Sequence, residues 1–158
     1  MREILFRGKS SETGKWREGC LLNVTLDGVT YNIVFGDDFA RSGTGVTAMA
    51  HSCVYPETVG QFTGLTDKNG KKIFEGDIVE YNNGFDYFKG FVVFENGSFG
   101  IGGYEVIGLS SGCCDNFANL WQLFWDQEVT DEPELYCCTV IGNIHDNPEL
   151  LEGGAGNG

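Results

Sequence analysis

Residues 20–35 read CLLNVTLDGVTYNIVF, and this stretch carries the clearest local signal of secondary structure in the chain. Asp27-Gly28 lies between two runs of alternating apolar and polar residues, and such a pair provides the positive φ angles of a type I′ hairpin turn. Pairing outward from the turn places on one face Leu26 with Val29, Val24 with Tyr31, Leu22 with Ile33 and Cys20 with Phe35. The opposite face pairs Thr25 with Thr30 and Asn23 with Asn32. Because a slip of one residue would destroy this agreement, the stretch predicts a hairpin with one apolar and one mostly polar face.

A second hairpin is predicted in FVVFENGSFGI at residues 91–101, with Asn96-Gly97 as its turn. This register places Phe94 opposite Phe99 and Val92 opposite Ile101. Two further turns are marked by Asn69-Gly70 and Asn83-Gly84. Residues 62–104 therefore read as four or five short strands, whose spacing fits a small SH3-like barrel, although a curled meander would give the same pattern.

The segment 113–125 fits two structures. Phe117, Leu120, Trp121 and Phe124 have helical spacing with Asp115 as a candidate N-cap, yet the aromatic content also suits a strand. An acidic loop follows at 126–134, and LYCCTVIGNI at 135–144 predicts a strand. Asn147-Pro148 predicts the start of a short C-terminal helix.

The expected fold is mainly β, between all-β and α+β, with antiparallel hairpins, a small SH3-like barrel and a short C-terminal helix. We divide the chain into an N-terminal β segment at 1–61 containing the hairpin 20–35, a barrel region at 62–104, an acidic C-terminal segment at 105–152 that shares the core, and a flexible tail at 153–158. The 24 glycines and three prolines agree with many tight turns between short strands.

Composition favours a globular protein of the cytoplasm. Apolar residues make up 41% and charged residues 21%, and no stretch approaches the roughly 20 apolar residues of a membrane span. The amino terminus lacks the apolar core of a signal peptide. In the cytoplasm the cysteines should be reduced thiols. They are Cys20, Cys53, Cys113, Cys114, Cys137 and Cys138.

The net charge is −13 and is unevenly distributed. Residues 1–20 contain five basic and three acidic side chains, whereas no Lys or Arg follows Lys89 and eleven acidic residues do. A strong anion is repelled by nucleic acids and anionic lipids, so we expect no direct nucleic-acid or membrane partner. A basic protein is the favoured partner.

No motif for metal binding or catalysis is recognisable. Adjacent Cys137 and Cys138 point to opposite faces of a strand and cannot readily share one ion, whereas His51 and Cys53 would share a face if extended. A Cys-His nucleophile would need His51 or His145, and neither lies in a known motif. Buried cysteines are common as small apolar residues, so we assign no metal ligand.

The other candidates for catalytic or ligand-binding residues also lack a specific motif. The carboxylate pairs Asp37/Asp38 and Glu75/Asp77 are expected to be solvated. FGIGG at 99–103 and RSGTG at 41–45 lack the Lys-Ser/Thr of a phosphate-binding loop. A cluster of aromatics is assigned to core or interface because Lys89 is the only Lys or Arg interleaved with it. It comprises Phe85, Tyr87, Phe88 and Phe91. No catalytic or cofactor-binding residue is assigned, and no cofactor is expected.

Several blocks resemble one known family. They are TGLTDKNGKKIFEGDIVEY at 63–81, VVFENGSFG at 92–100, VIGNIHDNPELL at 140–151, and MREILFRGKS with GKWREG near the amino terminus. Together they are similar to the YopX-like proteins of bacteriophages and prophages. The resemblance implies a mainly β fold and a phage or prophage origin, and it brings no catalytic residues because the family has no established activity. Two departures are His145, where such proteins often have an aromatic residue, and residues 110–135, which look like an insertion.

The 63–81 block also has a structural explanation. Gly64, Gly70 and Gly76 permit turns and close strand crossings, Ile78 and Val79 would fill a core, and Asp77 could accept backbone hydrogen bonds at a corner.

Three functional hypotheses follow. The leading one is a non-enzymatic phage accessory protein that self-associates and binds a basic host or phage protein, with residues 1–20 docking on the acidic half of a neighbour. The second is an acidic nucleic-acid mimic that inhibits a host DNA-acting protein. The third is an enzyme that uses a cysteine or a metal.

Overall fold

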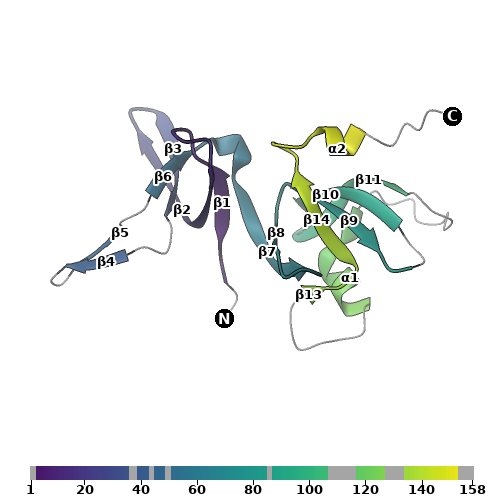
Figure 1. Cartoon of the computed structure of the whole chain (residues 1–158). Helices are drawn as coiled ribbons and strands as arrows, with labels where there is room; N and C mark the ends of the chain where they lie inside the picture. Colours follow the sequence, from purple (N-terminus) through teal and green to yellow (C-terminus); the bar gives the residue numbers. More distant parts are fainter. Residues whose placement is uncertain are drawn as a thin grey trace. The chain divides into compact units, whose positions relative to one another are not determined.

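The computed structural model describes residues 3–35, 39–42, 45–48, 51–84, 87–106, 117–126 and 134–152. Short strands dominate these residues, which confirms the mainly β class (Figure 1). The chain divides into two compact units, residues 1–62 and residues 63–158. No helix within the described ranges is long and apolar enough to cross a membrane.

The N-terminal unit is built on antiparallel strands in the order β1 (Phe6–Lys9), β2 (Trp16–Leu26), β3 (Val29–Phe35) and β6 (His51–Val54). The first residues of β7 (Gly60–Asp67) pair with β1 on its other side. A separate ribbon joins β4 (Phe39–Ser42) to β5 (Gly45–Ala48), and a 3-10 turn spans Pro56–Thr58.

The predicted hairpin at 20–35 is confirmed in every pair of its register, from Leu26 opposite Val29 to Cys20 opposite Phe35. Asp27 and Gly28 both have positive φ, at 50° and 78°, as a type I′ turn requires. Local turn chemistry and alternation therefore suffice to set this hairpin.

The core of the N-terminal unit packs against the hairpin on the face of β3 that carries Thr30, Asn32 and Val34. Val34 continues that face and is only 1% exposed, and Asn32 pairs with Val54, which is also buried. The base of β3 is thus covered on the face whose turn-proximal residues are polar.

The C-terminal unit contains a five-stranded antiparallel sheet. Its strands, in spatial order, are β12 (Phe117–Asn119), β11 (Ser98–Val106), β10 (Tyr87–Glu95), β9 (Asp77–Asn82) and β14 (Cys138–Asn143). The second half of β7 pairs with β8 (Lys72–Phe74) and, in parallel, with β13 (Glu134–Leu135). The predicted hairpin at 91–101 is confirmed, with Phe94 opposite Phe99 and Val92 opposite Ile101.

The expected SH3-like barrel at 62–104 is wrong, because the described strands of this region do not close on one another. Strand β9 pairs on its outer side with β14, and β11 pairs on its outer side with β12. Both edges are thus occupied by strands from outside 62–104, and the result is an open sheet.

The segment 113–125, for which the sequence predicted either a strand or a helix, contains a strand followed by a helix. Strand β12 ends at Asn119 and helix α1 (Leu120–Asp126) follows directly. The side-chain oxygen of Asn119 accepts the N–H of Gln122 at 3.0 Å and caps the helix. Asp115, the expected N-cap, lies outside the described residues. The C-terminal helix is confirmed as α2 (Glu149–Glu152).

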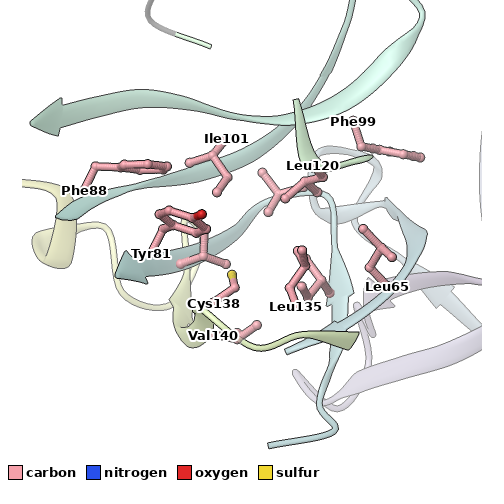
Figure 2. Packing of buried hydrophobic residues seen from close by; sticks show 12 residues of the cluster. Leu65, Tyr81, Phe88, Phe99, Ile101, Leu120, Leu135, Cys138 and Val140 are labelled. Atoms are coloured by element: carbon pink, nitrogen blue, oxygen red, sulfur yellow. The ribbon is translucent and has the colours of Figure 1, made fainter. Parts of the chain in front are cut away.

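One apolar cluster fills the C-terminal unit (Figure 2). Leu65, Ile101, Leu120 and Cys138 each have 0% exposure within it. The cluster therefore joins side chains from 62–104 to side chains from 105–152. Its members are Leu65, Ile73, Val79, Tyr81, Phe88, Val92, Phe99, Ile101, Leu120, Leu135, Cys138 and Val140.

Candidate interaction surface

The apolar face of the β2–β3 hairpin is open to solvent near its turn. The exposed fractions are 45% for Leu22, 60% for Leu26, 52% for Val29 and 43% for Tyr31. With half-buried Val24 these residues make up what we call the hairpin face. Figure 1 shows the two strands side by side, and their register places all five side chains on one side of the ribbon.

The opposite face of the same ribbon is polar and also exposed. The hydroxyls of Thr25 and Thr30 lie 2.9 Å apart across the strands and share a hydrogen bond. Asn23 is exposed beside them. The turn-proximal ribbon is therefore amphipathic, with both sides in solvent, and an isolated two-stranded ribbon of this kind is marginal in water.

The hairpin face is almost free of formal charge. Within residues 20–35 the only ionisable side chain of Asp, Glu, Lys or Arg type is Asp27, which lies in the turn. Apolar side chains grouped on the surface of a protein mark interaction sites more often than singly scattered ones do. This surface is suited to bind another neutral, apolar surface.

Among the described cysteines, Cys138 is the most deeply buried, and its surroundings do not favour a reactive thiolate. Burial, with smaller effects from the nearby Asp67 and Asp77 carboxylates, raises the pKa of the Cys138 thiol to about 12. The thiol is protonated at neutral pH, whereas a nucleophilic cysteine acts as a thiolate. Cys138 instead serves as a small apolar member of the core.

Asp67 acts as a backbone acceptor, a role that the sequence analysis missed. One carboxylate oxygen accepts the N–H groups of Asn69 at 2.8 Å and Lys71 at 2.9 Å, and the other accepts the N–H of Val140 at 2.9 Å. These bonds connect the turn after β7 to β14. The signal that could have found it is the Asp-Lys-Asn-Gly order, because Asp at the first position of a turn commonly accepts N–H groups two or more residues on.

The structural explanation of the 63–81 block is confirmed. Asp77 is buried and its carboxylate accepts the N–H of Phe74 at 2.8 Å, at the corner between β8 and β9. Ile78 and Val79 are fully buried. Gly70 and Gly76 have positive φ and lie in the connections after β7 and β8, whereas Gly64, also with positive φ, lies within strand β7 and not in a turn.

The remaining candidates are not gathered into a site. His51 and Cys53 both lie on β6, two residues apart, and the part of the chain that is described holds no group of three or more His, Cys, Asp or Glu suited to a metal. The expectation that Glu75 and Asp77 are solvated is wrong, because Asp77 is buried and Glu75 is half-buried. FGIGG lies within strand β11. Asp37, Asp38 and Phe85 fall outside the described ranges, as do 43–44 of the RSGTG stretch.

Three of the four aromatics singled out lie on strand β10 of the five-stranded sheet. Phe88 is buried and stacks on Tyr81, with ring centroids 4.8 Å apart. Tyr87 is half-buried, and its hydroxyl donates to Glu80 at 3.3 Å. Phe91 is half-buried on β10.

The chain matches one family model over nearly its whole length. A family model described as YopX protein matches residues 5–152. The chain belongs to the YopX family. The resemblance seen in the sequence blocks is thereby confirmed, and membership of the YopX family brings no activity or mechanism with it.

One solved structure has a related fold. The crystal structure of protein EF1440 from Enterococcus faecalis matches with a TM-score of 0.53 and 24% sequence identity, covering 96% of this chain and 99% of that chain. Likeness at this identity shows the fold alone. A search of curated proteins found no significant match.

Proposed function

We propose that this YopX-family chain is a phage or prophage accessory protein that acts in the host cytoplasm by self-association and protein binding, without catalysis. The observation that carries the proposal is the hairpin face. Four large apolar side chains that are each more than 40% exposed share one side of a two-stranded ribbon. Covering them with a protein partner removes apolar surface from water, at about 25 cal/mol per Å².

Three of the buried ionisable groups that the structure describes support a structural role. The carboxylates of Asp67 and Asp77 accept backbone N–H groups, and the thiol of Cys138 packs in the core. Each therefore has a sufficient explanation in folding.

An electrostatic contact is also part of the proposal. The basic side chains near the amino terminus include Arg7, whose guanidinium lies 4.9 Å from the centre of the Trp16 ring and which is only 9% exposed. Lys15 and Arg17 are exposed. Docking on an acidic neighbour would rest on these two side chains more than on Arg7.

Sedimentation velocity of the purified chain over a hundredfold concentration range tests self-association. We expect the average mass to rise with concentration above that of one chain. A single monomeric species at every concentration would remove the self-association part. Affinity purification from the infected or lysogenic host, followed by mass spectrometry, tests for a basic protein partner.

The charge distribution favours a second candidate, an acidic mimic of nucleic acid that inhibits a host DNA-acting protein. Residues 63–158 contain sixteen acidic residues and four lysines, whereas residues 1–62 contain seven acidic and six basic residues. A concentrated anionic unit competes for surfaces built to hold phosphates. Displacement of DNA from a captured host enzyme is the expected result, and unchanged DNA binding by every captured protein counts against this candidate.

A further inference from the structure

We propose that two copies of this chain associate by packing hairpin face against hairpin face. This inference rests on the proposed self-association and adds the surface through which it occurs. The occupant of the hairpin face is thus the same face of a second copy: Leu22, Val24, Leu26, Val29 and Tyr31.

The geometry of the ribbon suits this contact. The five side chains form two rows, one on each strand, that alternate with the outward polar rows. Antiparallel ribbons pack face to face about 10 Å apart, with their strands about 30° from parallel. Around a two-fold axis the same patch supplies both halves of the contact, which is the isologous arrangement common in dimers.

Charge favours a second copy over the basic partner that the whole chain would attract. A basic partner needs carboxylates to pair with, and the hairpin face has none among its five residues. A second hairpin face brings neutral apolar side chains against neutral apolar side chains. Residues 1–62, which carry the face, are close to electrical balance, with seven acidic and six basic residues. Like-charge repulsion therefore opposes this contact far less than it would oppose one through residues 63–158.

The size of the surface sets the strength of the contact. Stable complexes bury about 800 Å² on each partner, and exposed apolar patches on monomers rarely exceed a few hundred Å². Five side chains supply the centre of such an interface and only part of its area. We therefore expect a dimer that dissociates on dilution, with a Kd of the order of micromolar.

The dependence on salt separates this contact from electrostatic docking of the amino terminus. Ion pairs between exposed side chains weaken as salt screens them. Apolar contacts are strengthened by excluded salts such as sulfate. We expect ammonium sulfate to lower the dimer Kd, and a Kd that rises steeply with sodium chloride would assign the association to ion pairs.

Two matched double variants test the surface. Leu26→Lys/Tyr31→Lys places two charges on the hairpin face, and Asn23→Lys/Thr30→Lys places two at equivalent diagonal positions on the opposite face. All four wild-type side chains are exposed. We expect the first variant to raise the dimer Kd at least tenfold and the second to leave it within about twofold. Equal effects of the two variants, or none from the first, would overturn the proposal.

Photo-cross-linking on a nearly native hairpin tests the same contact in case the Leu26→Lys/Tyr31→Lys variant misfolds. The photo-reactive aromatic residue benzoylphenylalanine replaces Tyr31 or, as a control, Thr30, and the product is irradiated with an isotopically labelled second copy. Cross-links from position 31 to residues 20–31 of the labelled copy, absent from position 30, support the contact. Cross-links only within one chain, or to other parts of the second copy, overturn it.

These experiments distinguish failure of the hairpin contact from failure of the proposed self-association. A wild-type chain that is monomeric by sedimentation defeats both. A wild-type dimer that survives Leu26→Lys/Tyr31→Lys and shows no cross-link between hairpins defeats only the hairpin contact and leaves self-association standing.

Discussion

Cys138 shows how burial determines the chemistry of one side chain. Its thiol lies in the core of the C-terminal unit, where burial and the carboxylates of Asp67 and Asp77 raise its pKa to about 12. The unfolded chain has an ordinary thiol pKa of about 8.5. Between these values the unfolded state releases a proton that the folded state keeps, so the stability of the fold decreases as pH rises.

We therefore predict that Cys138→Ala alters the alkaline limb of the stability curve. Below about pH 8.5 the wild type should be more stable than the variant, because the variant leaves a cavity in the core. That advantage should shrink toward pH 12, by up to about 1.4 kcal/mol per pH unit. Urea unfolding from pH 8 to pH 11 measures it. Val140→Ala, which removes neighbouring apolar volume without a thiol, should show a constant offset, and a constant offset for Cys138→Ala would contradict the prediction.

Strands β1 and β6 approach closely at one position of the N-terminal unit. The N–H of Tyr55 donates to the carbonyl of Lys9 at 3.0 Å, and a β-bridge joins Ser10 to Val54. A Cβ atom at Gly8 would lie 2.8 Å from the Cβ of Val54. Glycine at this position therefore lets the two elements meet.

We predict that Gly8→Ala destabilises the fold by about 1–3 kcal/mol, because the added methyl group overpacks the contact with Val54. Val54→Ala should also destabilise, by leaving a cavity. In the double variant the two changes compensate, so its loss should be smaller than the sum by about 1 kcal/mol or more. Urea unfolding of the four proteins measures this coupling, and strictly additive losses would show that the methyl group is accommodated elsewhere.

At the scale of the whole molecule, the uneven distribution of charge affects the stability of the fold. Residues 63–158 hold sixteen acidic residues but only four lysines, so the excess carboxylates repel one another within one compact unit. Raising the ionic strength from about 0.01 M to about 0.1 M shortens the Debye length from about 30 Å to about 10 Å. Self-repulsion of this kind opposes the compact state.

We predict that this increase in sodium chloride raises Tm by a few °C, a change that thermal unfolding at constant protein concentration measures. Glu95→Lys/Glu149→Lys reverses two exposed charges and should show a smaller rise. A fall in Tm with salt would mean that attractive ion pairs outweigh the repulsion.

The local structures were predictable from the sequence, because their determinants lie within a few residues. Asp27-Gly28 and Asn96-Gly97 readily adopt the positive φ angles that a tight hairpin turn requires. Apolar residues face one another across the flanking strands, and both hairpins have the predicted register. Asp77 at its corner and the short helix after Pro148 follow the same kind of local rule. The sequence by itself therefore determined the mainly β class, the hairpins and the family.

Tertiary structure alone decided the rest. The pairing of β9 with β14 joins residues about sixty positions apart, and no local signal indicates that partner, so an open sheet stands where spacing suggested a barrel. The bond from Val140 to Asp67 has the same long-range origin. The exposure of the hairpin face is also a tertiary result, since alternation divides a strand into two faces but does not state which one the rest of the chain covers. In the N-terminal unit the core packs against the side of the hairpin that carries Val34, whereas Leu26 on the other side stays exposed. Which side is buried depends on which residues distant in the sequence pack against the hairpin.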